Sequence, residues 1–163
     1  SLCDESARVP FIISTPDRKR AGETEAALAS AGVDLFPTLC EYAGITPPAW
    51  LHGRSVKPFV DGNFPSDWRE DVAAENEFAT TQLPLGYRAR MIRTDRYKYI
   101  AYSRGQHNEQ LFDMHEDPQE SVDLAGNPAF RSVLVEHRER MRCWCEKTDD
   151  YFVMTNDEIP RLE

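Results

Sequence analysis

The stretch MIRTDRYKYI, residues 91–100, decides how the second half of the chain is interpreted. The basic side chains of Arg93, Arg96 and Lys98 stand among the aromatic rings of Tyr97 and Tyr99. Such a pattern is typical of a cationic, aromatic platform for nucleic acid, and also of a β-hairpin that is covered by other elements. The remainder of the chain distinguishes between these two interpretations.

The charge of the chain argues against nucleic acid as a partner. Its 163 residues carry a formal net charge of −9, and the isoelectric point is about 5.0. An acidic chain is a poor binder of polyanions overall, even where it has a local basic patch. No apolar run approaches the roughly 18 residues of a membrane-spanning helix. We therefore expect neither a nucleic-acid partner nor a membrane partner.

The four cysteines carry little information about function. Cys143 and Cys145 form a C-x-C pair, which lacks the two-residue spacer that is usual in zinc and redox pairs. A metal site that also uses His137 is an alternative to a plain helix end with buried or surface thiols. The compartment in which the protein works is left open.

The quoted stretch predicts a hairpin, with residues 88–93 and 96–102 as its strands and Thr94 and Asp95 at a tight polar turn. On the second strand Tyr97 and Tyr99 share one face, and Lys98 shares the other with Ile100 and Tyr102. Neither face is purely polar. We therefore expect a sheet that is covered on one face and partly covered on the other.

Further strands and a helix flank this hairpin. Residues 72–78 and 110–114 each have the composition of a short strand. Residues 128–145 repeat apolar side chains at helical spacing, with Asn127 as the expected N-cap and Pro128 at the first position. These elements predict a small antiparallel sheet packed with a C-terminal helix.

The first half of the chain has a different pattern. Residues 9–13, VPFII, form a short apolar run that predicts a buried strand of parallel type. Residues 33–43 predict a helix with Gly44 as its C-cap. Its apolar face would contain Val33, Phe36, Cys40 and Ala43, with Leu35, Leu39 and Tyr42 widening it.

Together these elements predict an α+β fold in which the lone strand and its helix are the end of an α/β domain. A single buried parallel strand needs neighbours, and the chain offers no obvious ones. We expect residues 1–62 to be the end of that α/β domain and residues 63–147 to be the sheet-plus-helix subdomain. Residues 148–163 would form an irregular tail.

Several stretches resemble one family. From about residue 4 to 126, the sequence is similar to the C-terminal third of a sulfatase of the alkaline-phosphatase-like superfamily. The similar stretches occur in the same order as in that family. The similar stretches are DESARVPFII (4–13), VDLFPTL (33–39), AGI (43–45), GRS (53–55), RTDRYKYI (93–100), QLFD (110–113), EDPQE (116–120) and DLA (123–125). The resemblance implies that residues 93–100 are a structural hairpin whose basic side chains pair with nearby carboxylates, with EDPQE as one source.

The resemblance also implies a sulfuric ester hydrolase of which this chain is a C-terminal fragment. Members of that family use a formylglycine, made from Cys or Ser in a C/S-x-P-x-R motif, together with calcium. None of the four cysteines stands in such a motif, and we expect that no serine does either. We expect this chain to contain no catalytic residue and no metal ligand, to bind no cofactor itself, and to be inactive alone.

Four residues are candidates for a substrate rim that supplies specificity contacts. His52 and Arg54 lie in a glycine-containing loop from which they can reach an anionic substrate; the alternative is that they anchor the loop by hydrogen bonds. Glu75 and Asn76 end a predicted strand, where they can bond sugar hydroxyls or simply face solvent.

The expected partners follow from the same resemblance. In the complete enzyme the substrate would be a sulfated small molecule or glycan, and the missing N-terminal core would be the physical partner. The alternative is a standalone, non-catalytic binding or scaffold module that associates with a second copy through the unpaired strand. A relative acting on phosphonate or phosphate esters is also compatible with this sequence.

Overall fold

The structure is a computed structural model that describes residues 2–17, 20–80, 83–105 and 107–152, without the side chains of 78–80 and 83–87. It divides into two compact units. One contains Ser1–Arg8 and Ala73–Glu163, and the other is Val9–Val72. Most of the predicted tail, from residue 153 onward, lies outside the described residues.

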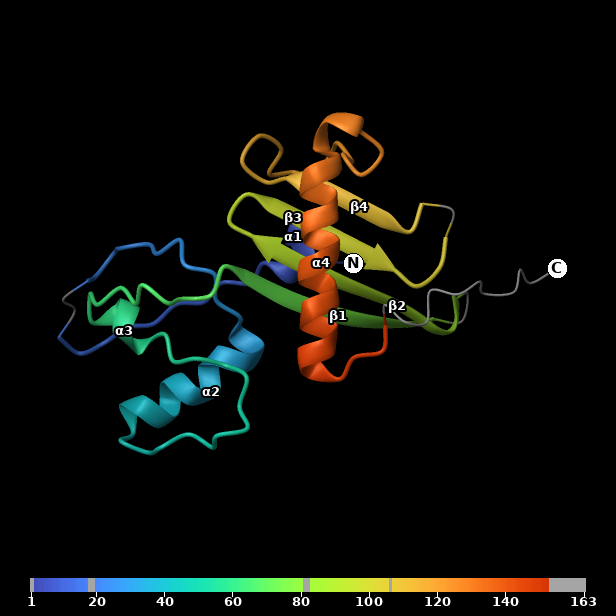
Figure 1. Cartoon of the computed structure of the whole chain (residues 1–163). Coiled ribbons are helices and arrows are strands. Elements are labelled where there is room, and N and C mark those ends of the chain that lie inside the picture. Colours follow the sequence, from blue (N-terminus) through green and yellow to red (C-terminus); the bar gives the residue numbers. More distant parts are fainter. Residues whose placement is uncertain (1, 18–19, 81–82, 106, 153–163) are drawn as a thin grey trace. The chain divides into compact units, whose positions relative to one another are not determined.

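A four-stranded sheet forms the centre of the first unit (Figure 1). Its strands, β1 (Asp71–Thr80), β2 (Leu83–Thr94), β3 (Tyr97–Tyr102) and β4 (Glu109–Asp113), follow one another in the order β1-β2-β3-β4. β2 pairs with β3 antiparallel, with Arg93 opposite Lys98, and β3 pairs with β4 antiparallel. The predicted hairpin and both flanking strands are confirmed.

Helix α4 (Arg131–Thr148) covers one face of this sheet, and the 3-10 turn η1 (Pro128–Phe130) leads into it. The side chain of Asn127 accepts a hydrogen bond from the amide of Ala129, so the predicted N-cap is present. The predicted helix and its inward face are confirmed. The side chains buried between α4 and the sheet are Ile92, Tyr99, Ala101, Leu111, Leu134, Met141, Cys145 and Phe152.

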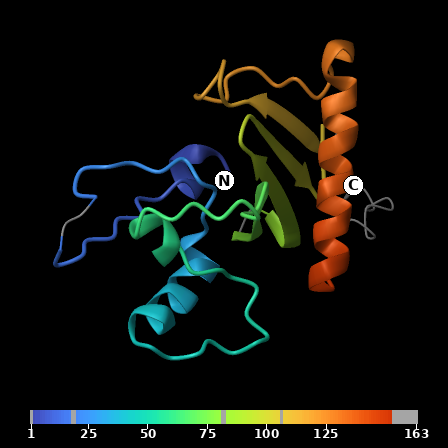
Figure 2. The same ribbon diagram turned by 60° about the vertical axis from the view of Figure 1, so that its left-hand side comes forward.

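The opposite face of the sheet has a core of its own. Leu2 packs there with Met91, Ile100 and Phe112, next to the short helix α1 (Asp4–Ala7). Figure 2 shows α4 on one side of the sheet and α1 on the other. Tyr99 and Ile100 alternate between the two cores, so both faces of β3 are covered, which is more than the full cover on one face and partial cover on the other that the sequence predicts.

Two of the basic side chains of the quoted stretch, Lys98 and Arg96, are paired with carboxylates, whereas the guanidinium of Arg93 bonds the backbone carbonyls of Thr94 and Asp95. Lys98 is fully buried and forms ion pairs with Asp4 and with Glu120, the last residue of EDPQE. The guanidinium of Arg96 bonds the buried carboxylate of Asp113, and these hydrogen bonds hold the pKa of Asp113 below its ordinary value. The stretch therefore builds the core of this unit, as the resemblance implied.

The second unit contains the helices α2 (Ala31–Tyr42) and α3 (Lys57–Val60). The prediction of a buried strand at residues 9–13 is wrong for this structure, because these residues are in no strand and Ile12 is 86% exposed. A strand needs a neighbour for its N–H and C=O groups. The described part of the chain offers none, since all four of its strands belong to the sheet β1–β4.

The orientation of α2 also differs from the prediction, although the helix itself and its glycine C-cap at Gly44 are confirmed. Its buried residues are Asp34, Pro37, Thr38 and Cys40. Of the seven residues predicted to face the core, only Cys40 is buried. The exposed apolar residues include Val33, Leu35, Phe36, Leu39 and Tyr42. The polar side faces inward because the loop after residue 52 forms hydrogen bonds with it.

Candidate functional site

The loop that contains His52 and Arg54 passes directly over the first turn of α2. A Cβ atom placed on Gly53 would lie 1.8 Å from the carbonyl oxygen of Val33, a distance that only a glycine avoids. In a regular helix the carbonyl of Val33 would accept a bond from residue 37, but Pro37 has no N–H. The close approach of the loop therefore occurs where the helix has no donor of its own.

The carboxylate of Asp34 holds this loop in place. Its carboxylate is fully buried and accepts hydrogen bonds from the amides of Ser30 and Arg54, both at 2.8 Å. The guanidinium of Arg69 binds the same carboxylate with two bonds of 2.6 and 2.7 Å. Such paired, charge-assisted bonds fix direction as well as distance. We call this arrangement of Asp34, Arg69 and the two amides the Asp34 clamp.

A second polar residue of α2 supports the clamp one turn later. The hydroxyl of Thr38 donates to the carbonyl of Asp34 at 2.6 Å and accepts from the amide of Val56 at 3.0 Å. Val56 is the N-cap residue of the short helix α3, whose Phe59 is buried. The inward polar face of α2 therefore holds the loop and the start of α3 through specific hydrogen bonds.

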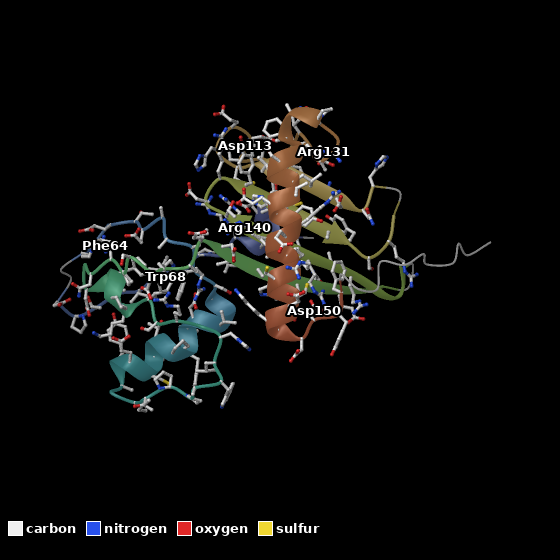
Figure 3. The ribbon with its side chains drawn as sticks, viewed as in Figure 1. Phe64, Trp68, Asp113, Arg131, Arg140 and Asp150 are labelled. Carbon is white, nitrogen blue, oxygen red and sulfur yellow. The ribbon has the colours of Figure 1, made fainter. Side chains whose placement is uncertain are left out.

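The side chain of Arg54 points away from the clamp and pairs with a different carboxylate. Its guanidinium bonds both oxygens of Asp67 at 3.1 Å and lies 4.8 Å above the ring of Trp68. Trp68 is held by a bond from its indole N–H to the carbonyl of Leu28 and by an edge contact with Phe59. Figure 3 shows Trp68 and Phe64 on the segment that follows α3.

Arg54 is therefore positioned with some precision, and 39% of its side chain is exposed. His52 is exposed beside it. Two roles are predicted for these residues, specificity contacts and anchoring of the loop, and both require a loop that is held in place. The backbone amide of Arg54 anchors the loop by its hydrogen bond to Asp34.

Glu75 and Asn76 lie on β1, in the other unit. The exposed carboxylate of Glu75 lies 3.4 Å from the guanidinium of Arg90, which also bonds Asp150 at 2.5 Å. Arg90 packs over the ring of Phe152 at 4.9 Å. Glu75 is thus part of an ion-pair group on the sheet, and Asn76 is partly buried next to it in sequence.

No group of three or more His, Cys, Asp or Glu side chains within the described residues is arranged to hold a metal ion. The described residues therefore do not fit a calcium site. In the same described residues, no helix is both long enough and apolar enough to cross a membrane.

The expectation that no serine stands in a C/S-x-P-x-R motif is wrong, because the letters S-x-P-x-R occur once in the sequence, as STPDR at residues 14–18. Ser14 is exposed, and the hydroxyl of Thr15 donates to the carboxylate of Asp17 at 2.7 Å. Residue 18 lies outside the described residues. The match follows the DESARVPFII stretch, whereas the resemblance implies that the nucleophile motif of a sulfatase precedes that stretch.

Solved structures with this fold identify the class of protein. The structure of a 2-O GAG sulfatase matches with a TM-score of 0.66 at 31% identity, over 78% of this chain and 28% of that chain. The phosphonate monoester hydrolase of Agrobacterium radiobacter matches with a TM-score of 0.62 at 26% identity, over 74% of this chain and 25% of that one. The fold is that of the C-terminal region of sulfatases in the alkaline phosphatase superfamily.

The family is shown by a sequence model as well. Residues 1–147 match the model described as N-sulphoglucosamine sulphohydrolase, C-terminal, and the chain belongs to this family. It is 35% identical to a Delta 4,5-hexuronate-2-O-sulfatase of Bacteroides thetaiotaomicron, over 99% of this chain and 33% of that protein. It is 32% identical to human arylsulfatase K over 77% of this chain and 24% of that protein. The chain thus spans a third or less of the length of these relatives.

Proposed function

We propose that this chain is the non-catalytic C-terminal part of a sulfuric ester hydrolase and that it turns over no sulfate ester alone. The observation that carries the proposal is the match of residues 1–147 to a C-terminal sulfatase family. Sulfatases supply the alignments over 99% and 77% of this chain, yet only 33% and 24% of those proteins is covered.

The chemistry of ester hydrolysis also supports a non-catalytic role for this chain. Negative charge concentrates in the transition state, and it must be met by a metal ion or by preorganised donors beside an activated nucleophile. For the complete protein, the resemblance implies calcium and a formylglycine. The described residues do not fit a calcium site. In our proposal this chain performs no step of the reaction.

What this chain contributes, in our proposal, is a set of specificity contacts to a sulfated sugar. Arg54 is the strongest candidate, because the clamp fixes its backbone while part of its guanidinium stays exposed. His52 is exposed beside it and can donate to a sulfate or hydroxyl oxygen. Glu75 and Asn76, which lie on β1 in the other unit, are a separate candidate, because their polar groups suit sugar hydroxyls. A sulfated sugar as substrate is supported by the relatives' names, which include a hexuronate-2-O-sulfatase and an N-acetylglucosamine-6-O-sulfatase.

Hydrolysis of a chromogenic aryl sulfate in the presence of calcium tests the proposal. The assay compares the 163-residue chain with the complete gene product and with a Ser14→Ala variant of that product. A phosphonate monoester is assayed alongside. We expect turnover of the sulfate by the complete protein and by its S14A variant, and none by the short chain.

Two results would overturn the proposal. Turnover by the short chain would mean that a nucleophile lies within it. Loss of all activity in S14A, with the fold intact, would place that nucleophile at Ser14. Faster turnover of the phosphonate than of the sulfate would instead correct the reaction class.

A further inference from the structure

We propose that the carboxylate of Asp67 is an internal competitor of the substrate, which occupies the guanidinium of Arg54 until a sulfate group of the sugar displaces it. The proposal rests on the proposed function, because it takes Arg54 to contact a sulfated sugar. It adds a residue that sets the affinity of this contact.

Two arginines pack against the ring of Trp68, and the carboxylates that they bind differ in exposure. The guanidinium carbons of Arg54 and Arg69 lie 4.8 and 4.9 Å from the ring centre. Arg69 bonds the fully buried carboxylate of Asp34 at 2.6 and 2.7 Å. Arg54 bonds the oxygens of Asp67 at 3.1 Å, and that side chain is 79% exposed. Charge-assisted bonds are typically about 2.7–2.9 Å long, so only the second pair is loose enough to exchange.

The guanidinium of Arg54 has supports that do not involve the carboxylate of Asp67. Its Nη1 donates to the backbone carbonyl of Asp67 at 2.6 Å, and its plane lies against the ring of Trp68. Its backbone amide is held by Asp34. Rotation of the Asp67 side chain into solvent would therefore uncover Nη2 while these contacts keep the guanidinium in place.

A sulfate group has the chemistry to take the place of this carboxylate. It carries a negative charge and several acceptor oxygens, and a guanidinium binds such anions through paired N–H donors. A neutral sugar hydroxyl forms a bond about half as strong, since only one partner is charged. A sulfated sugar can thus replace Asp67 on Arg54, whereas an unsulfated sugar competes poorly.

The exposure of Asp67 sets the size of the effect. Ion pairs this exposed are weak, with a formation constant of about 1–5. Arg54 would then be free of the carboxylate for about one half to one sixth of the time. Apparent affinity falls in proportion to the fraction of protein that is competent to bind. Removing the carboxylate should therefore tighten the binding of a sulfated sugar by about 2–6-fold.

Binding of a sulfated disaccharide to the complete gene product tests the proposal. The probe joins a 2-O-sulfated unsaturated hexuronate to a 6-O-sulfated glucosamine, and thus carries both kinds of sulfate in the relatives' names. Calorimetry measures its dissociation constant for the parent, Asp67→Ala and Arg54→Met, and for the double variant. Asp61→Ala is the matched control, because it removes an equal charge from a carboxylate that pairs with Lys57. The steady-state KM and kcat for the same disaccharide are measured alongside.

We expect Asp67→Ala to bind the disaccharide about 2–6-fold more tightly and to lower KM by the same factor. The kcat should not change, because a contact made equally in the ground state and the transition state affects KM alone. Asp61→Ala should leave binding unchanged. Arg54→Met should weaken binding, and adding Asp67→Ala to it should give no further gain, because no guanidinium is left to uncover.

Unchanged or weaker binding by Asp67→Ala would overturn the proposal. So would an equal gain in Asp61→Ala, or a gain that persists beside Arg54→Met, because either would show a general effect of charge. Turnover that neither Arg54→Met nor Asp67→Ala alters would refute the contact and leave the hydrolase standing. A gain in binding without turnover of any sulfate ester would refute the proposed hydrolysis and leave the role of Asp67 standing.

Discussion

Replacing Asp34 with alanine should destabilise Val9–Val72 strongly, because a single buried carboxylate serves four donors there. The change removes the acceptor of the Ser30 and Arg54 amides and both bonds from Arg69, whose side chain is 17% exposed. Removing one partner of a buried ion pair typically costs about 3–5 kcal/mol, much of it from the charge left unpaired. The four bonds are coupled, so their separate values do not add. We expect Asp34→Ala to cost about 3–5 kcal/mol.

The assay is urea unfolding followed by the fluorescence of Trp68, which stacks against Arg54 and Arg69. Trp50 and Trp144, the other two tryptophans, are first replaced with phenylalanine so that the signal reports this unit. Hydrogen exchange of the Arg54 amide provides a second measurement. Its protection should fall in Asp34→Ala, since its acceptor is gone.

A matched control and a double-mutant cycle make the test decisive. Asp67→Ala removes the other carboxylate that Arg54 contacts, which is 79% exposed and should cost only about 0–1 kcal/mol. Asp34→Ala and Arg69→Met should show a coupling energy of roughly 1–3 kcal/mol. A loss below about 1 kcal/mol for Asp34→Ala, or purely additive effects, would show that the clamp does not hold this unit together.

Two further predictions concern the sheet unit. Lys98→Met leaves the carboxylates of Asp4 and Glu120 close together without their shared cation, and should cost about 3–5 kcal/mol in urea unfolding followed by far-UV circular dichroism. Adding Glu120→Gln should recover part of that loss, and a cost as large in the double variant would contradict the ion-pair explanation. Arg96→Met should lower stability at neutral pH, because the pKa of Asp113 is depressed mainly by its hydrogen bonds with Arg96. A depressed native pKa contributes stability above the unfolded value, and the contribution is lost as the pH falls through the native pKa. The difference between wild type and variant should therefore be largest above about pH 4 and should shrink below it, and a constant difference would refute this cause.

Surface residues supply controls for both of these variants. Arg131→Met removes an exposed cation from the first turn of α4, and Lys147→Met removes one from its last turn. Neither should change stability by more than about 0.5 kcal/mol. The stability of Arg131→Met should also follow pH as the wild type does.

The fold of the sheet unit could be predicted because its signals are local. Alternation along β3 and the polar turn at Asp95 determine the hairpin, and Asn127 with Pro128 marks the start of the last helix. The pairing of Lys98 with Glu120 joins residues 22 apart, and no spacing rule predicts it. It was expected only as a consequence of the family resemblance.

The candidate site was less predictable for the same reason. Periodicity locates the apolar stripe of α2 but does not say what covers it. The carboxylate of Asp34 binds Arg69, 35 residues further along, and the amide of Arg54, 20 residues further along. The available signals are an aspartate in the first turn of a largely apolar helix and a glycine before Arg54. Both signals indicate a buried contact without naming its partner.

The Asp34 clamp explains why α2 keeps its apolar stripe outward. Leaving Leu35, Phe36 and Leu39 about half exposed forgoes on the order of 2–4 kcal/mol of burial, a cost that would favour rotating the helix by half a turn. Rotation would break the bonds of Asp34 and Thr38. Breaking a buried ion pair costs about as much free energy as that burial would supply. Hydrogen bonds are directional, so they fix the rotation of the helix about its axis, whereas apolar burial does not. The contacts that position the loop of Arg54 therefore also determine which side of α2 is left exposed.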